Sequence, residues 1–266
     1  MPRIPKKTIV VTGGCTGIGK AIARRCVAEG ANVVVCGLQQ ELGNALVQEL
    51  GTTKAALHIE DLTSDGCPQR IVELSLARFG RLDAIVNNAA LIATGTIHTT
   101  DAALLNRFLA INTIVPFLMI QAALPQLQQN QGCVLNIGSV NAYSGEPDLL
   151  PYSVSKGALM TLTRNLGDSL MRQHGVRVNQ INPGWVLTEA EEKRKQQEGL
   201  GENWHADLPK TYSPSGRIIM PEEIAAAAIY WLADECGPIS GQVVDLEQYP
   251  FIGRNPPKNE TTIHET

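Results

Sequence analysis

The chain has 266 residues, of which 44% are hydrophobic and 18% are charged, and its net charge is −4. This composition excludes a disordered chain, and the absence of a basic stripe argues against nucleic acid or an anionic membrane as a partner. The six cysteines have neither CxxC pairs nor partner histidines, so we expect reduced thiols, no metal site and a cytoplasmic protein. We expect no signal peptide, and the longest apolar stretch, residues 111–124, is too short to cross a bilayer.

Short apolar runs alternate with segments of helical spacing along the chain. The expected strands are residues 8–12, 32–36, 54–59, 82–86, 133–138, 176–181 and 241–246. The expected helices are residues 20–29, 41–50, 67–79, 101–127 with a kink at Pro116, the segment from 152, and 221–233. Such alternation, without a linker or a repeat, predicts one α/β domain, residues 1–266, with a doubly wound parallel sheet of about seven strands.

A glycine-rich turn from Gly13 to Gly19 joins the first strand to the first helix. Glycines at this place let backbone N–H groups and the helix N-terminus approach a pyrophosphate, as in a Rossmann-type fold. In that fold the end of the second strand meets the adenosine ribose. Here Gly37 and Leu38 are followed by two glutamines, so the usual acidic or basic discriminator between NAD and NADP is missing.

A possible acid/base pair lies in the segment from residue 139 to 156. Tyr152 and Lys156 are four residues apart in a predicted helix and therefore share one face. A neighbouring ammonium would lower the pKa of the phenol from about 10 toward working pH, which suits a general acid/base for an alcohol or carbonyl oxygen. Ser139 could hold the same oxygen. A Tyr-x-x-x-Lys alone also occurs on ordinary solvated helices.

The motifs together resemble the short-chain dehydrogenases/reductases over about residues 7–246. Their order and spacing match that family at Thr12-Gly-Gly-Cys-Thr-Gly-Ile-Gly19, Asn87-Asn-Ala-Ala90, Asn112, Ser139, Tyr152-x-x-x-Lys156 and Asn182-Pro-Gly184. The resemblance implies NAD(P)-dependent interconversion of a secondary alcohol, or a sugar hemiacetal, and a carbonyl. The sequence departs from the family at Ala90, usually glycine, and after the last strand, where Val244-Asp-Leu-Glu-Gln248 replaces Asp-Gly-Gly.

The resemblance also implies roles for four catalytic residues. Tyr152 would exchange a proton with the substrate oxygen, and Lys156 would lower its pKa and bond the nicotinamide ribose. Ser139 would orient the substrate oxygen, and Asn112 would hold a water that relays protons.

The implied cofactor site is larger. Asp61 and Leu62 would contact adenine, Asn88 the nicotinamide side and Thr188 the carboxamide. The full set that the resemblance implies is Gly13, Thr16, Gly17, Ile18, Gly19, Gly37, Leu38, Asp61, Leu62, Asn88, Ala89, Tyr152, Lys156, Pro183, Gly184, Val186 and Thr188. NADP-preferring members tend to carry a basic residue where this chain has Thr16 and Leu38. Burying a 2′-phosphate without a cation is costly, so NAD is favoured over NADP. Gly37 is expected to leave room for either.

Residues 189–215 form a polar segment too long for a plain connection, which predicts a lid. Hydrogen-bonding groups mixed with tryptophans favour a sugar, sugar acid or polyol as the small-molecule substrate. The candidate substrate residues are Asn141, Tyr143, Glu146, Trp185, Glu189, Trp204, His205 and Lys210. The alternative for Trp204 and His205 is that they only pack the lid shut.

Two other functions stay open. A 3-oxoacyl thioester reductase shares every catalytic motif but predicts NADPH and a basic patch for a carrier. A nucleotide-sensing protein without chemistry has little reason to keep all four catalytic residues. The resemblance further implies a homotetramer through the helices after residues 101 and 152. The C-terminal extension, residues 247–266, is expected to be ordered to about residue 257, packing either at a subunit interface or on its own domain.

Overall fold

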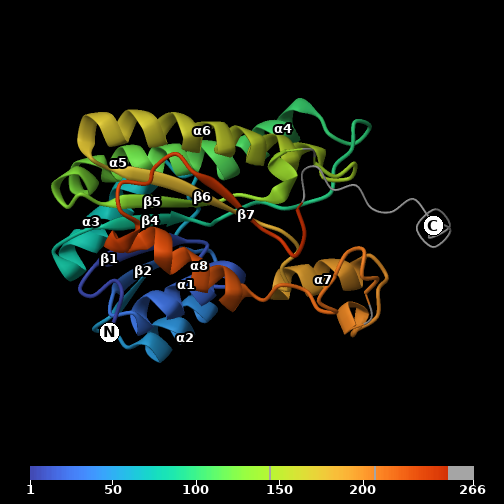
Figure 1. Cartoon of the computed structure of the whole chain (residues 1–266), viewed down its shortest axis with the longest axis horizontal. Coiled ribbons are helices and arrows are strands. Elements are labelled where there is room, and N and C mark those ends of the chain that lie inside the picture. The colour runs from blue at the N-terminus through green and yellow to red at the C-terminus, as the bar shows by residue number, and fades with distance from the viewer. Residues whose placement is uncertain (144, 207, 251–266) are drawn as a thin grey trace.

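The computed structural model describes residues 1–143, 145–206 and 208–250 (Figure 1). One parallel sheet of seven strands runs in the order β3-β2-β1-β4-β5-β6-β7. The strands are β1 Thr8–Thr12, β2 Asn32–Gly37, β3 Ala55–Ile59, β4 Ala84–Asn87, β5 Cys133–Ile137, β6 Arg177–Pro183 and β7 Val243–Leu246. The predicted seven-stranded α/β domain is therefore confirmed.

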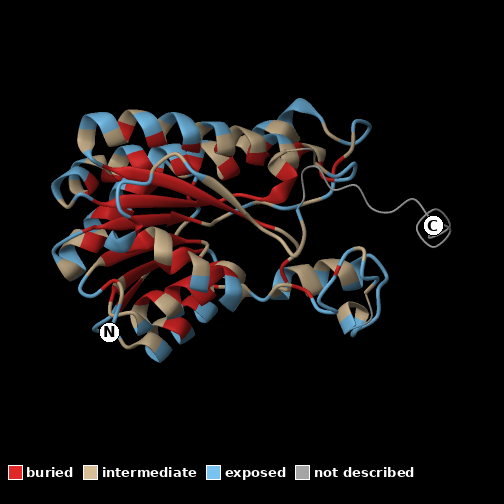
Figure 2. Ribbon diagram, viewed as in Figure 1, coloured by how far each residue is buried: buried red, intermediate tan, exposed pale blue. Residues whose placement is uncertain are grey.

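Helices cover both faces of the sheet (Figure 1). One layer holds α1 Gly17–Ala28, α2 Gln40–Leu50 and α8 Pro221–Leu232; the other holds α3 Cys67–Phe79, α4 Ala102–Leu109, α5 Val115–Gln129 and α6 Leu150–His174. Within β1, Ile9 and Val11 pack into the first layer and Val10 into the second, because successive side chains of a strand point to opposite faces. The central strands β1, β2, β4 and β5 are almost wholly buried, as Figure 2 shows, which explains their largely apolar sequences.

The strand order reverses beside β1, which pairs with β2 on one side and β4 on the other. Doubly wound sheets bind ligands outside the carboxyl ends of their strands at such a reversal. The glycine turn follows β1, and Asn88 follows β4, so both lie at this place.

The helical run from Ala102 to Gln129 is irregular at its centre. Asp101 caps it by accepting a hydrogen bond from the Leu104 amide at 2.7 Å. A π-turn, Ala110–Ile114, separates α4 from α5 and carries Asn112. Pro116 lies at the start of α5, directly after this π-turn, and the kink there stays a prediction.

The same run is long and apolar enough to cross a membrane by length and composition alone, with a mean hydropathy of 1.7 over its most apolar window. This run, Ala102–Gln129, is longer than the apolar stretch predicted from the sequence, residues 111–124. Phe108, Met119 and Leu127 on this run are fully buried against the rest of the protein, which is also how the core helix of a globular domain packs. Such a single helix is weak evidence for a membrane span.

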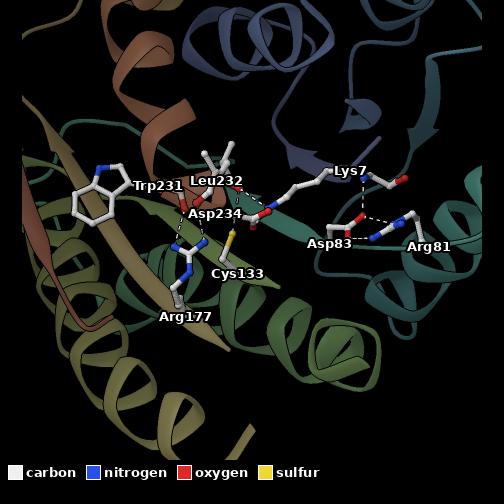
Figure 3. Close-up of polar contacts among 10 residues, drawn as sticks. Lys7, Arg81, Asp83, Cys133, Arg177, Trp231, Leu232 and Asp234 are labelled. Atoms are coloured by element: carbon white, nitrogen blue, oxygen red, sulfur yellow. Dashed lines mark hydrogen bonds and ion pairs between the residues drawn. The ribbon is translucent and has the colours of Figure 1, made fainter. Parts of the chain in front are cut away.

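The amino ends of the strands, here called the amino edge of the sheet, are held in place by the hydrogen bonds of charged side chains (Figure 3). Buried Arg177 donates to the carbonyls of Trp231 and Ala233 at 3.0 and 3.2 Å, and Lys7 donates to the Leu232 carbonyl at 3.1 Å. These contacts satisfy the free carbonyls at the C-terminal end of α8 with cations, which the helix dipole favours. Nearby, Asp83 accepts from Arg81 and from the Thr8 amide.

The predicted lid contains a short helix, α7 Glu189–Gln197, and a single turn, η3 Trp204–Ala206, both set apart from the sheet (Figure 1). Two further turns are η2 Val140–Ala142 and η4 Asp234–Cys236. The predicted behaviour of the C-terminal extension from residue 251 onward lies outside the described residues.

Candidate active site

The glycines of the turn after β1 are required by close packing. Gly13 has a φ of +61°, and a Cβ there would lie 2.8 Å from the Ala89 Cα. A Cβ on Gly19 would collide with the Gly13 carbonyl and the Asn88 amide. Any larger residue at these two positions would push the turn away from the end of β4, so the turn forms a cradle that side chains would fill.

Asn88 serves this turn. Its amide donates to the carbonyls of Thr12 and Gly13 at 3.0 and 3.1 Å, which uses both amide hydrogens. The Thr12 hydroxyl accepts from the backbone amides of Asn88 and Ala89. The predicted contact of Asn88 with the nicotinamide side is therefore limited to its carbonyl oxygen.

The N-terminus of α1 already holds a carboxylate. Thr16 is the N-cap residue but makes no side-chain cap, and the Gly17 amide donates instead to Glu189 Oε2 at 3.0 Å. The other oxygen of Glu189 pairs with the Lys20 ammonium. Partial burial is the largest single effect and opposes ionisation of Glu189, but Lys20 and the backbone amides of Glu189 and Gly17 together outweigh it, so the pKa is lowered. This end of α1 therefore binds an oxyanion, as a diphosphate site must. Ile18 packs on the core.

The region where adenosine is expected lies at the ends of β2 and β3. A Cβ on Gly37 would approach the buried Cys15 sulfur to 2.6 Å, so this position accepts no side chain. Leu38 is 63% exposed and free to meet a ligand. One carboxylate oxygen of Asp61 accepts both from the Thr63 amide and from the Thr63 hydroxyl, and the other oxygen makes no bond to Thr63. The Leu62 side chain is buried.

A group with metal-ligand chemistry lies near this region. The ligand atoms of His58, Glu60 and Cys67 all lie within 4.8 Å of one another. The guanidinium of Arg70 contacts both carboxylate oxygens of Glu60 and holds the pKa of Glu60 down at about 2. Arg70 thus already neutralises the Glu60 carboxylate, so Glu60 needs no metal ion to balance its charge.

Three of the predicted catalytic residues come together at the carboxyl ends of β4 and β5. Tyr152 and Lys156 on α6 are 8% and 2% exposed, and Ser139 follows β5. The Lys156 ammonium donates to the Ile137 carbonyl at 2.7 Å and lies 5.7 Å from the centre of the Tyr152 ring. The Ser139 side chain lies near the Tyr152 phenol and acts to lower its pKa.

The predicted direction of the Tyr152 pKa is wrong in this structure. Burial raises the pKa of Tyr152 to about 12, with Ser139 acting the other way and Glu146 and Glu191 adding to the rise. Burial also lowers the pKa of Lys156 to about 7. Desolvation disfavours the charged form of both groups, and an ammonium that is only half protonated near neutral pH stabilises a phenolate weakly.

Asn112 ties three segments together. Its amide donates to the Leu91 carbonyl at 3.0 Å and to the Ser155 hydroxyl at 2.9 Å, and its oxygen accepts from the Leu91 amide. The Ser155 hydroxyl in turn donates to the Tyr152 carbonyl. Both amide hydrogens are used within the protein, so the predicted relay water cannot be held by them.

The predicted substrate residues fall into two groups. Asn141 donates to Glu146 at 3.1 Å, and the Glu146 charge acts on Tyr152, so this pair lies at the catalytic centre. Trp185 instead stacks on Trp204 with ring centres 5.3 Å apart, and Trp204 meets the His205 ring edge-on. These rings pack the lid together, which is the alternative interpretation of Trp204 and His205. Tyr143 is half-buried beside Asp245, and Lys210 is exposed.

Thr188 and the residues before it position the lid. The Thr188 hydroxyl caps α7 by accepting from the Glu191 amide at 3.2 Å. Val186 is buried and pairs with Ile219, while Pro183 ends β6 and Gly184 follows it. Thr188 itself lies beside the turn after β1, because a Cβ on Gly17 would lie 3.3 Å from its methyl group.

Sequence reasoning missed three charged residues. Glu191 accepts from the Trp185 indole at 2.8 Å and pairs with Arg194. Glu247 accepts from the Trp185 amide at 3.1 Å and leaves no room for a side chain at Gly184. The spacing Thr188-x-x-Glu191 at a helix start and the substitution at Glu247 were the available signals.

Comparison with known proteins agrees with this architecture. A family model described as enoyl-(acyl carrier protein) reductase matches residues 13–247. The L-fucose dehydrogenase of Mus musculus is 37% identical over 235 residues, 88% of this chain and 84% of that protein. The 2-(S)-hydroxypropyl-CoM dehydrogenase 3 of Xanthobacter autotrophicus is 33% identical, covering 90% of this chain and 94% of that protein. The momilactone A synthase of Oryza sativa subsp. japonica is 32% identical, covering 89% and 86%. The chain belongs to the short-chain dehydrogenase/reductase family and is an NAD(P)-dependent oxidoreductase acting on CH–OH groups.

Proposed function

We propose that this protein oxidises a secondary hydroxyl of a sugar or polyol, or the hydroxyl of a sugar hemiacetal, and catalyses the reverse reduction. The observation that carries the proposal is the buried Ser139–Tyr152–Lys156 cluster beside a turn that binds an oxyanion. Ser139 holds the substrate oxygen, and Tyr152 exchanges a proton with it. The bound nicotinamide cofactor supplies or accepts the hydride.

Lys156 can influence the protonation of Tyr152 through its own charge. With a pKa of about 7, its charge changes within the working range of pH. A protonated Lys156 favours the phenolate of Tyr152, and a neutral Lys156 does not. Proton exchange at Tyr152 therefore depends on the charge of its neighbour, which suits a general acid/base.

NAD is the proposed cofactor. Neither Thr16 nor Leu38 offers a cation to a 2′-phosphate. A phosphate buried without a cation would lose much of its hydration without compensation.

A neutral, polyhydroxylated substrate fits the charges near Tyr152. Glu146 and Asn141 can hydrogen-bond to several hydroxyls, and the L-fucose dehydrogenase relative acts on a sugar by its name. The second candidate is an acyl thioester, which the description of the family model and the CoM-named relative support. The carboxylates of Glu146 and Glu191 beside the site disfavour a sugar acid or the anionic carrier of a thioester.

The test is absorbance at the reduced-nicotinamide band. The purified protein is offered NAD or NADP with a panel of aldoses, polyols and sugar acids, and with hydroxyacyl thioesters as controls. We expect reduction of NAD by a neutral sugar or polyol. Activity confined to NADP and a thioester would overturn the proposal in favour of the second candidate.

We also propose a cytoplasmic homotetramer. Exposed apolar side chains gather on the helices where the interface was predicted, namely Ile114, Phe117 and Leu118 around α5 and Val154 on α6. Their exposure in one chain favours burial against another copy. The six cysteines are all free and buried, which agrees with a reducing compartment.

A further inference from the structure

The carboxylate of Glu189 joins the lid to the glycine-rich turn after β1. Glu189 is the first residue of α7, and its two oxygens take the Gly17 amide and the Lys20 ammonium. The contact extends to the neighbouring residue, because a Cβ on Gly17 would lie 3.3 Å from the Thr188 methyl group. The N-terminus of α7 is thus seated on the N-terminus of α1.

A diphosphate must compete with this carboxylate. The N–H groups at the start of α1 and the glycine turn are the ones that a dinucleotide needs in this fold. Two anions cannot share one amide and one ammonium without strong repulsion at such short distance. Either Glu189 leaves when the nucleotide enters, or the nucleotide does not bind.

Lys20 is the cation that the exchange makes available. Glu189 is its one ion-pair partner in the described part of the chain, and the Lys20 side chain is only 27% exposed. When Glu189 leaves, the ammonium stays beside the Gly17 amide with its charge unpaired. A phosphate oxygen in the place of Glu189 Oε1 would restore a charge-assisted hydrogen bond.

We propose that Lys20 is a phosphate-binding residue of the nucleotide site, and that Glu189 occupies the phosphate position in the free enzyme and is displaced on binding. The inference rests on the proposed nucleotide-dependent function. Because Glu189 begins α7, its displacement frees the first turn of the lid as the nucleotide arrives.

The test is calorimetric titration with ADP-ribose, which has the diphosphate but lacks nicotinamide, and with adenosine, which lacks phosphate. In Glu189→Gln the dissociation constant for ADP-ribose should fall about three- to tenfold, because a neutral amide competes less well. In Lys20→Gln it should rise by about the same factor. Adenosine affinity should not change. Glu49→Gln is the matched control, since it breaks the pair that Arg24 of α1 makes with Glu49 of α2, away from the turn.

The lid provides a readout independent of affinity. Trp185 and Trp204 stack on each other, and Trp185 is bonded to Glu191 of α7, so their fluorescence reports on the lid. We expect ADP-ribose to change this fluorescence in the wild type, and the free Glu189→Gln variant to show the changed spectrum already.

The outcomes separate the two proposals. If the wild type binds ADP-ribose and neither variant alters its affinity, the roles of Lys20 and Glu189 are wrong and the nucleotide site stands. If ADP-ribose does not bind to the wild type, Lys20→Gln or Glu189→Gln, the proposed function fails, and the inference fails with it.

Discussion

A cation is buried at each end of the strands, at the amino edge and at the opposite, carboxyl edge, and the two cations have opposite properties. At the amino edge, Arg177 is 6% exposed and donates to two carbonyls at the end of α8. At the carboxyl edge, Lys156 is 2% exposed, donates to one carbonyl, and has a pKa lowered to about 7. The arginine is satisfied and structural. The lysine is held in a state that can gain or lose its proton near neutral pH, which is the property that a catalytic site needs.

The comparison predicts that Lys156→Met has effects of opposite sign on activity and stability. Turnover should fall by about 10²- to 10⁴-fold, because Tyr152 loses the charge that favours its phenolate. The free energy of unfolding at pH 7 should rise by about 1–3 kcal/mol, because removing a desolvated amine gains more than leaving the Ile137 carbonyl without its donor costs. Initial rates and urea unfolding check the two halves. A loss of stability would contradict the account.

Arg177→Met should lower stability and leave activity unchanged. Removing the guanidinium leaves the carbonyls of Trp231 and Ala233 buried without these donors, which should cost about 2–4 kcal/mol of unfolding free energy. The rate per folded molecule should stay unchanged, since this edge lies across the sheet from the catalytic residues. The same urea unfolding series measures the loss, and a fall in the rate of the folded fraction would show that the two edges are not independent.

The pH dependence of stability sharpens the contrast. The folded pKa of Lys156, about 7, lies below its ordinary 10.5, so the unfolded chain binds more protons between these values and the free energy of unfolding rises with pH across that window. Tyr152, with a folded pKa of about 12 against 10.0, acts in the opposite direction above pH 10. Urea unfolding at pH 7, 8 and 9 should give a steeper rise for the wild type than for Lys156→Met. Equal slopes would show that Lys156 keeps its ordinary pKa.

A smaller effect is expected on the outer surface. Phe117→Glu places a charge on the exposed apolar face of α5 and should shift a tetramer toward smaller species in light scattering. Ile97→Glu is the control, because Ile97 is more exposed but lies outside the helices of the proposed interface. A wild type that is fully active as a monomer would contradict the proposed assembly.

The sheet and the catalytic residues were predictable because their signals are local. Each strand is an apolar run, and Tyr152 and Lys156 share a helix face at a spacing of four. The π-turn around Asn112 was not predictable, since its register depends on packing against Leu91 and Ser155. The bond between Gly17 and Glu189 joins residues 172 positions apart. The direction of the Tyr152 pKa was missed because burial, which the sequence does not state, outweighs a neighbouring charge.

The most direct test of the account is NAD binding measured beside NAD reduction in the wild type and in Tyr152→Phe. We predict that both proteins bind NAD with similar affinity in calorimetry. With the sugar or polyol that gives the best rate in the substrate panel, only the wild type should then develop reduced-nicotinamide absorbance, and the variant should be slower by about 10²- to 10⁴-fold. Equal turnover by Tyr152→Phe would remove Tyr152 from the chemistry and contradict the central claim.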